Sequence, residues 1–265
     1  MRNEGAKAPS FHGKMARKLP GKQWSIDEIG FLHYNSPYVL RIVPFGTGRK
    51  KGGTPVKRIM IPALLLVLAL SVTACGAGQK TFQRGSVEGQ TYSSEFLGLT
   101  CTAPEEFRYL SDQEIAQLND IALDSITDSG LAKEMRQRLE EGSQVQDMYL
   151  MTEDGRHWIS ITVDQVTDGK TEVDMDAFVA NGVTQAEEAY GAIDGMEDVV
   201  SAAQTATFLG KEYDSILTTA TYNGFPAQSL QVCIPVGRYI CVVTFTSYVE
   251  EQTAEMMDFF SAIEK

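Results

Sequence analysis

The pattern of hydrophobic and polar positions divides the chain at one apolar run. Residues 59–72 read IMIPALLLVLALSV and contain no charged side chain. A helix that crosses a bilayer needs roughly 20 apolar residues, so this run of fourteen is too short to span one comfortably. Its length is typical of the hydrophobic core of a signal peptide.

The chain after this run has two parts. Residues 76–94 are polar, contain Gly and Ser and show no period, which is typical of a flexible tether. Residues 95–265 alternate between helical and strand-like periods. They are numerous enough to form one hydrophobic core, so we expect a single domain.

Apolar residues recur at helical spacing in four segments of this domain. The first segment begins at the capping box Ser111-Asp112-Gln113-Glu114, and the last begins at Ser247-Tyr248-Val249-Glu250. Asn181-Gly182 weakens the middle of the third. The four predicted stripes are Ile115, Leu118 and Ile121; Leu131, Met135 and Leu139; Met175, Phe178, Val179, Val183, Ala186, Tyr190 and Ile193; and Val249, Met256, Phe260 and Ile263.

Strand-like patterns occupy the remaining segments. We expect strands at residues 96–103, 145–152, 156–163, 205–209, 213–222, 229–235 and 238–247. Asp154-Gly155 predicts a type I′ hairpin that places Leu150 opposite Ile159 and Met148 opposite Ile161. Short turns imply antiparallel neighbours. The order β-α-α-β-β-α-β-β-β-β-α predicts an α+β fold in which helices cover a mainly antiparallel sheet.

Charge changes sign along the chain. Residues 1–58 contain twelve Lys and Arg against three Asp and Glu, a net charge of +9. The remaining residues contain eleven basic and 32 acidic side chains, a net charge of −21. Such an acidic balance argues against binding to nucleic acid or to an anionic lipid surface.

The residues around the apolar run complete an export signal. Lys57 and Arg58 precede it, and the small residues Thr73 and Ala74 follow it. The motif Val72-Thr73-Ala74-Cys75 resembles the lipobox of bacterial lipoprotein precursors. The resemblance implies that Cys75 receives diacylglycerol, that the bond before it is cut, and that the mature protein is anchored on the extracytoplasmic side of a bacterial membrane. The alternatives are an ordinary secreted signal peptide and a short membrane anchor.

Residues 56–74 are therefore predicted to form the signal peptide, residues 75–94 the tether and residues 95–265 the exported domain. We expect residues 1–55 to be a disordered upstream extension that the native product lacks, because they show no period. Lys50-Lys51-Gly52-Gly53 can be encoded by a purine-rich run like a ribosome-binding site, and a native start at Val56 or Met60 would follow. The alternative is a basic cytoplasmic arm that binds nucleic acid, although such arms are denser in Lys and Arg.

Three short motifs resemble a known family of exported domains. They are Leu97-Gly98-Leu99, Pro104-Glu105-Glu106-Phe107 and Gly210-Lys211-Glu212-Tyr213. In this element order the pattern resembles the PsbP-like and DcrB-like α/β/α sandwich of small exported lipoproteins, although relatives often have Gly-Trp where this chain has Glu106-Phe107. The resemblance implies accessory or binding modules without catalytic activity, whose partners differ from member to member.

Candidate catalytic residues are few. The part after Cys75 contains one histidine, His157, which follows the predicted Asp154-Gly155 turn and is expected to be an exposed strand residue. The sequence contains no Gly-x-Ser-x-Gly, His-Glu-x-x-His, Walker or dinucleotide-binding motif. We therefore predict that the protein has no catalytic site.

An acidic run offers the best candidate for a cation site. It comprises Asp164, Asp168, Glu172, Asp174 and Asp176. Its spacing does not fit the EF-hand loop. Acidic side chains stabilise a helix N-terminus, so we expect a solvated loop leading into a helix rather than calcium ligands. No cofactor is expected beyond the lipid on Cys75.

Three further cysteines and a tryptophan remain. Cys233 and Cys241 lie symmetrically about Gly237 on adjacent predicted strands, so they can either form a cross-strand disulfide or be two small buried residues. Cys101, in an apolar strand, is expected to pack in the core. Trp158 is expected opposite Met151, on the face away from Leu150, where it packs against a helix.

Together these patterns predict a lipid-anchored protein of the cell envelope. Its exported domain is expected to be a non-enzymatic accessory or protein-binding module for an unknown envelope partner. The alternative is a lipoprotein that binds a small ligand or a divalent cation. An enzyme is the third hypothesis, and it would require a cleft that joins His157 or a pair of carboxylates.

Overall fold

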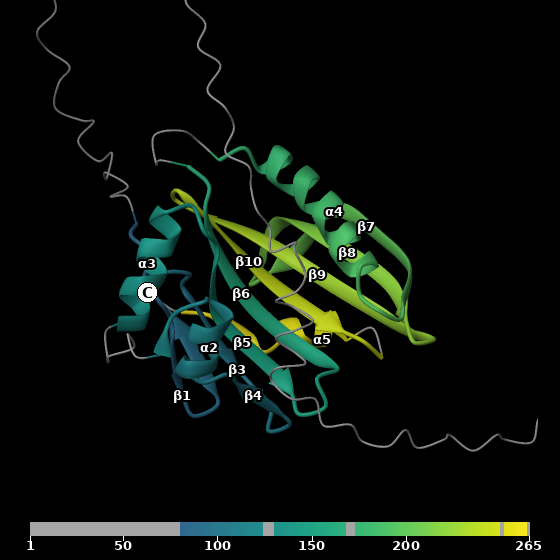
Figure 1. The fold of residues 1–265 in the computed structure, drawn as a ribbon, viewed down its shortest axis with the longest axis horizontal. Coiled ribbons are helices and arrows are strands. Elements are labelled where there is room, and N and C mark those ends of the chain that lie inside the picture. Colours follow the sequence, from purple (N-terminus) through teal and green to yellow (C-terminus); the bar gives the residue numbers. More distant parts are fainter. Residues whose placement is uncertain (1–79, 124–129, 168–172, 250–251, 264–265) are drawn as a thin grey trace, which may run out of the picture.

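The protein is described by a computed structural model over residues 80–123, 130–167, 173–249 and 252–263. These residues form a mixed α+β fold dominated by antiparallel sheets (Figure 1). The predicted fold class is therefore confirmed. No helix in these ranges is long and apolar enough to cross a membrane.

The strands and helices follow one another along the chain as the sequence pattern changes period. The strands are β1 (Ser86–Glu88), β2 (Thr91–Ser94), β3 (Leu99–Thr102), β4 (Phe107–Tyr109), β5 (Val145–Thr152), β6 (His157–Gln165), β7 (Met196–Phe208), β8 (Lys211–Tyr222), β9 (Phe225–Val236), β10 (Tyr239–Ser247) and β11 (Phe260–Ala262). The helices are α2 (Asp112–Leu118), α3 (Gly130–Glu140), α4 (Met175–Gly191) and α5 (Thr253–Met257).

The strands form two sheets. The larger has the order β4-β5-β6-β10-β9-β8-β7, and the smaller has the order β1-β2-β3-β11. Neighbouring strands are antiparallel in both. In the larger sheet, β4 and β7 are the two edge strands, and β10 lies in the middle.

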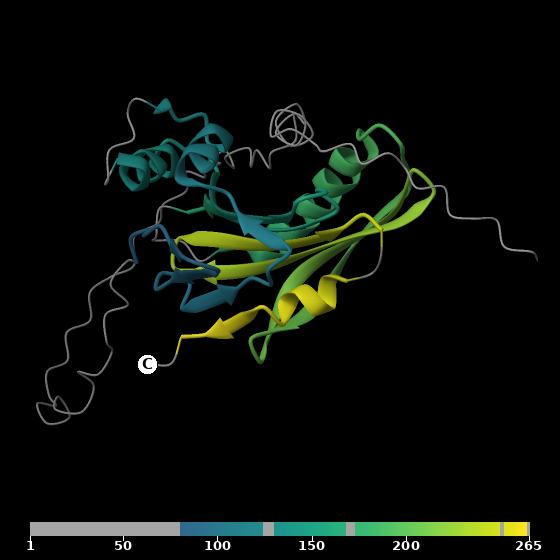
Figure 2. The same cartoon turned by 90° about the horizontal axis from the view of Figure 1, so that it is seen from below.

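Helices cover one face of the larger sheet (Figure 2). On that face α3 packs against β5 and β6, while α4 packs against β7 and β8. The smaller sheet and α5 lie against the other face. The predicted helical cover is thus found on one side, and a second sheet, closed by the C-terminal strand β11, covers part of the other.

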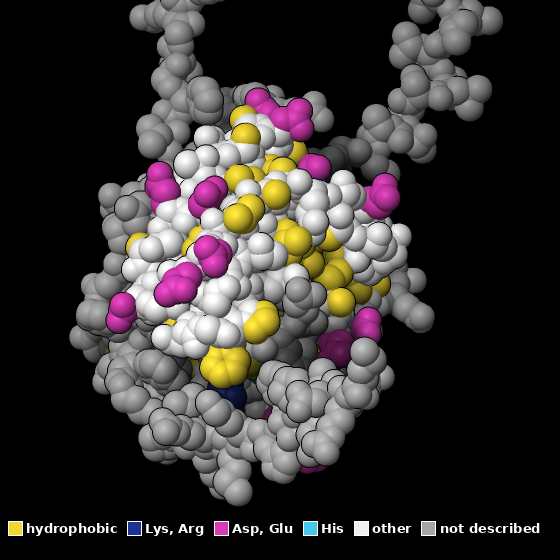
Figure 3. Space-filling model, turned by 90° about the vertical axis from the view of Figure 1, so that its right-hand side faces the viewer, with side chains coloured by type: hydrophobic (Ala, Val, Ile, Leu, Met, Phe, Trp, Pro, Cys, Tyr) yellow, Lys and Arg dark blue, Asp and Glu magenta, His cyan; other side chains and the backbone are white. Residues whose placement is uncertain are grey.

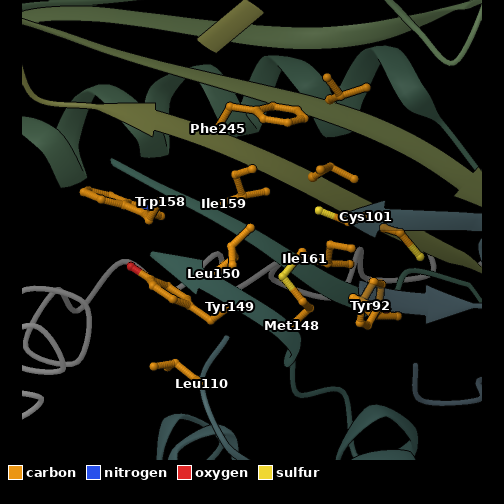
Figure 4. Packing of buried hydrophobic residues seen from close by; sticks show 14 of the residues in the cluster. Tyr92, Cys101, Leu110, Met148, Tyr149, Leu150, Trp158, Ile159, Ile161 and Phe245 are labelled. Carbon is orange, nitrogen blue, oxygen red and sulfur yellow. The ribbon is translucent and has the colours of Figure 1, made fainter. Parts of the chain in front are cut away.

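The main core lies between the two sheets. Leu150, Ile159 and Phe245 stand side by side across β5, β6 and β10, and each is 0% exposed (Figure 4). Met148 lies opposite Ile161 in the same way. The predicted register of the β5–β6 hairpin is therefore confirmed.

The turn of this hairpin differs from the predicted type. A type I′ turn requires positive φ at both central residues. Gly155 has a φ of 68°, but Asp154 is not among the residues with positive φ. The Asp154 carboxylate accepts a hydrogen bond from the Thr152 hydroxyl at 2.7 Å, and the Gly155 N–H donates to the Thr152 carbonyl at 3.0 Å. The type I′ signature occurs instead at Asn223-Gly224, with φ values of 49° and 83°.

The turn between β9 and β10 determines which face of the sheet each of two cysteines occupies. Gly237 and Arg238 form this turn together, with Val236 opposite Tyr239, whereas the prediction centred it on Gly237 alone. A register shift of one residue moves side chains to the other face of a sheet. Cys233 therefore packs beneath α4, while Cys241 lies in the main core. Both thiols are free and buried, so of the two alternatives the structure has two small buried residues and not the disulfide.

Residues 80–94, which we term the entry segment, are part of the folded domain. The prediction of a flexible tether extending to residue 94 is wrong for these residues, because they form β1 and β2. Phe82 is 0% exposed and Tyr92 is 1% exposed. The ring of Phe82 packs edge-on against Phe96, which packs in the same way against Tyr239, with centroid distances of 5.4 and 5.5 Å.

Helices form in the three segments predicted before residue 195, although α2 ends before Ile121 and α4 ends before Ile193. α2 begins at the Ser111–Glu114 capping box, with both reciprocal hydrogen bonds present. α4 begins at Asp174, whose side chain accepts from the Ala177 N–H at 3.0 Å. Gly182 does not interrupt α4: a Cβ there would lie 2.5 Å from Cδ1 of Ile216, so glycine permits close packing of the helix on the sheet.

The predicted C-terminal helix is wrong. Ser247 ends strand β10 instead of capping a helix, α5 has five residues, and Phe260 begins strand β11. The ring of Phe260 packs between Phe208 and Phe245 at centroid distances of 5.2 and 5.6 Å. Pairing with β3 satisfies the backbone of this segment, so the burial of one aromatic ring outweighs the helical pattern.

We expect Phe82→Ala to lower the free energy of unfolding by about 3–5 kcal/mol, because it leaves a cavity where a ring is fully buried. The matched control is Phe225→Ala, which removes a ring that is 49% exposed and should change stability by less than about 1 kcal/mol. Urea unfolding measures both. Equal effects would contradict the placement of the entry segment in the core.

Candidate functional site: a buried carboxylate beneath the entry segment

Strand β5 contains a carboxylate in its interior. Asp147 lies at the register shift between Gln146 and Met148 and is 2% exposed. A buried carboxylate is unfavourable unless hydrogen-bond donors or a positive charge surround it. The donors of Asp147 come from the entry segment.

Two residues of the entry segment donate hydrogen bonds to Asp147. The Tyr92 hydroxyl donates to Oδ2 at 2.6 Å, and the Gly85 N–H lies 3.3 Å from both carboxylate oxygens. These contacts join β2 and the residue before β1 to β5 of the other sheet. A hydrogen bond to a charged acceptor is about twice as strong as a neutral one. This carboxylate is therefore one polar link between the sheets, and the Tyr109 hydroxyl of β4 forms another by donating to the Cys101 carbonyl of β3 at 2.7 Å.

Arg84 connects the carboxylate to α2. Its Nη2 donates to Oδ1 of Asp112 at 2.8 Å, and its Nε lies 4.0 Å from Oδ1 of Asp147. The longer distance is too great for a hydrogen bond, so Arg84 acts on Asp147 through its charge. The Arg84 side chain is 15% exposed, and this partial burial strengthens the attraction.

Burial dominates the protonation equilibria of the site. It raises the pKa of Asp147 to about 6, against the lowering effects of the Tyr92 hydrogen bond and the Arg84 charge. Burial also raises the pKa of Tyr92, and the neighbouring carboxylate adds to that shift. The Tyr92 hydroxyl therefore remains a hydrogen-bond donor at neutral pH.

The space around these groups is small. A cavity about the size of one water molecule is lined by Arg84, Gly85, Tyr92 and Asp147 together with apolar residues of β5 and α2. A Cβ on Gly85 would lie 2.3–2.5 Å from the Tyr92 ring. The arrangement holds the start of the fold tightly and has no room for an organic substrate.

A second buried carboxylate, Asp164, lies on β6. It is 6% exposed, stands opposite Ile240 of β10, and its Oδ2 has no hydrogen-bond partner in the described part of the chain. Burial raises its pKa to about 6. The prediction that Asp164 belongs to a solvated loop is wrong, because the residue continues the β6 strand.

The other predicted cation ligands do not join Asp164. Asp174 caps α4 and Asp176 lies in its first turn, as expected for acids at a helix N-terminus. Asp168 and Glu172 lie outside the described residues. Within the described ranges, no group of three or more His, Cys, Asp or Glu side chains could hold a metal ion.

The remaining candidates occupy separate places. His157 begins β6 and is half-buried rather than exposed, with its N–H donating to the Thr152 hydroxyl at 3.2 Å. Cys101 is fully buried, as predicted. Trp158 lies opposite Met151, as predicted, and packs edge-on against Tyr248 at 4.7 Å. Cys75 and its motif lie outside the described residues.

The sequence analysis missed Arg84, Gly85, Tyr92 and Asp147. One signal was present: Asp147 is the only charged residue in the predicted strand VQDMYLMT. Its partners could not be found by pattern, because Tyr92 and Gly85 are 55 and 62 positions away. They also lie in a segment whose polar composition is typical of a tether.

Comparisons with known proteins give limited matches. No family model and no curated protein matches the chain. Among solved structures, the cyanobacterial PsbP of Synechocystis sp. PCC 6803 is 12% identical with a TM-score of 0.38, covering 72% of this chain and 98% of that protein. LpqN of Mycobacterium tuberculosis, described as involved in cell envelope biogenesis, is 11% identical with a TM-score of 0.27, covering 62% and 82%. At such scores these likenesses carry no conclusion about this chain.

We expect Gly85→Ala to destabilise the fold by about 1–3 kcal/mol, because the new methyl group overlaps the buried Tyr92 ring. The control is Gly191→Ala, where a Cβ meets nothing within 4 Å and should be neutral or slightly stabilising. Thermal unfolding distinguishes the two. An unchanged melting temperature for Gly85→Ala would contradict the close contact.

We expect the stability difference between the native chain and Asp147→Asn to depend on pH. The folded-state pKa of Asp147 is raised to about 6, so from about pH 4 to 6 folding takes up a proton that the unfolded chain releases. The contribution of this group to the free energy of unfolding therefore falls as pH rises through that window and is constant above it. Asp147→Asn lacks this ionisable group. Its free energy of unfolding, relative to that of the native chain, should therefore rise by about 1–3 kcal/mol between pH 4 and 7.

Urea unfolding at several pH values measures this difference. Tyr92→Phe is the companion variant: it removes the donor that lowers the pKa of Asp147, so the window should extend to higher pH. A difference between the native chain and Asp147→Asn that stayed constant from pH 4 to 7 would contradict the buried, perturbed carboxylate.

Proposed function

We propose that the chain is the precursor of a lipid-anchored envelope protein whose α+β domain is a non-enzymatic accessory or protein-binding module. The motif Val72-Thr73-Ala74-Cys75 supplies the anchor in this proposal. The observation that carries it is the position of the first buried side chain among the described residues: Phe82 follows Cys75 by seven residues and is 0% exposed. The fold thus begins directly behind the proposed anchor.

This spacing limits how far the domain can move from a membrane. Only six residues separate Cys75 from Phe82, and the seven fully extended steps from one to the other reach about 25 Å. The reach is a strict upper limit, whereas a flexible tether of about nineteen residues would average roughly 25 Å and extend much further. The domain is therefore held next to the lipid surface.

The buried carboxylate suits the same role. Any pull on the anchor is transmitted to the entry segment, which Asp147 holds to β5 through Tyr92 and Gly85. Displacing the segment would break the hydrogen bonds that Tyr92 and Gly85 donate to Asp147. This link lets the anchored chain carry a load without unfolding from its first strand.

Two acyl chains hold a protein stably at a membrane, whereas one binds only marginally. We therefore expect Cys75→Ser to release the protein from sedimented membranes and to abolish incorporation of labelled fatty acid and cleavage before residue 75. The matched control is Thr73→Ser, which keeps a small residue in the motif and the Cys75 thiol. Membrane fractionation and intact mass measure the result. Continued membrane attachment and cleavage of Cys75→Ser would contradict the proposal.

A further inference from the structure

The larger sheet has an exposed edge at β7. This strand has thirteen residues and follows β8 in unbroken register from Val200, opposite Thr219, to Phe208, opposite Lys211. No described strand pairs with its outer side. In an antiparallel pair the N–H and C=O groups of alternate residues point away from the partner. β7 therefore presents a row of backbone donors and acceptors to solvent.

The other sheet edges in the described ranges are short. β4 ends the larger sheet at the opposite side, and β1 and β11 end the smaller sheet; each has three residues. Short edge strands are one of the devices by which proteins avoid unwanted pairing. Among the described edge strands, β7 alone is long enough to pair with a further strand.

The usual protections are missing along most of β7. Its bulge lies near the start, between Glu197 and Val200. The following residues, VSAAQTATF, include no charged residue, proline or glycine. Most of them are small, and Ala202, Ala203, Gln204 and Thr205 are all exposed. Val200 is also exposed, at 59%. Because most side chains of this stretch are small, a neighbouring strand can approach the edge without displacing a large one.

Acidic residues surround this uncharged stretch. Those exposed on β7, β8 and the loop before β7 are Asp194, Glu197, Asp198, Glu212 and Asp214, against one basic residue, Lys211. The right-hand side of the molecule in Figure 1, seen face-on in Figure 3, carries scattered acidic side chains and few basic ones among the described residues. A ligand strand for this edge is therefore favoured when it is basic.

We propose that β7 is a docking edge that accepts, by strand addition, an extended Lys- or Arg-bearing segment of a partner protein. The inference rests on the proposed binding function and names its surface and the chemistry of its partner. Backbone hydrogen bonds to residues 200–208 provide the affinity, and the acidic side chains select the charge of the ligand. The small β7 side chains tolerate varied neighbours.

A second copy of the chain fits this edge less well. Antiparallel pairing of two β7 strands would bring together two regions that each hold five exposed acids and one lysine on β7, β8 and the loop before β7. Like charges placed together across an interface are unfavourable by several kcal/mol. Charge complementarity therefore selects a basic segment over self-association.

The test uses the full-length chain in detergent and a labelled nine-residue peptide of alternating Lys and Val. Fluorescence anisotropy at low salt should detect binding, and a Glu-Val peptide of the same length should not bind. Ala203→Lys places a like charge in the docking edge and should weaken binding about tenfold. Thr205→Lys is a second variant on the same edge, in case the first fails to fold. Hydrogen exchange should slow at residues 200–208 when the peptide is bound.

The matched control is Ala180→Lys, which makes the same change at an exposed position of α4 and should bind like the native chain. Equal binding by Ala203→Lys and the native chain, no binding of the Lys-Val peptide, or slowed exchange elsewhere would overturn the inference. A dimer of the chain that Ala203→Lys dissociates would overturn it in favour of self-pairing. Cys75→Ser should bind the peptide normally, so failure of the anchor and failure of the docking edge appear in different measurements.

Discussion

One buried carboxylate, Asp147, links the two sheets. Asp147 is 2% exposed, and in that environment a carboxylate must be either protonated or surrounded by donors. The hydroxyl of Tyr92 and the N–H of Gly85 provide those donors, and Arg84 adds a positive charge. Separating the smaller sheet from the larger one would break these hydrogen bonds. Hydrophobic contacts around Phe82 add stability, but this polar link fixes where the entry segment sits.

Local signals predicted much of the fold. The capping box at Ser111, the helical stripe from Leu131 to Leu139 and the register of Leu150 with Ile159 are all present, because each depends on residues near one another in sequence. The prediction of a terminal helix was wrong for the opposite reason. Phe260 gains more from packing with Phe208 and pairing with β3 than from a helical turn, and neither partner is close in sequence. Competition between local and distant contacts is settled by burial.

The site was less predictable than the fold. One turn illustrates the cause: placing it on Gly237-Arg238 instead of on Gly237 alone puts Cys233 and Cys241 on opposite faces. Asp147 stands out in the sequence as a charged residue in an apolar strand, but its partners lie in a segment with few apolar residues. Phe82 and Tyr92 show that two well-placed aromatic rings are enough to make such a segment part of the core.

The topology separates the proposed anchor from the proposed docking edge. The entry segment is held at β5, while β7 lies five strands away in the order β5-β6-β10-β9-β8-β7. Strands in a sheet are about 4.8 Å apart, so the two positions differ by roughly 24 Å across the larger sheet. This distance is comparable to the greatest reach of the six residues after Cys75. In the proposed arrangement, in which the entry segment lies near a lipid surface, the long edge would therefore have room for a partner strand away from the point of attachment.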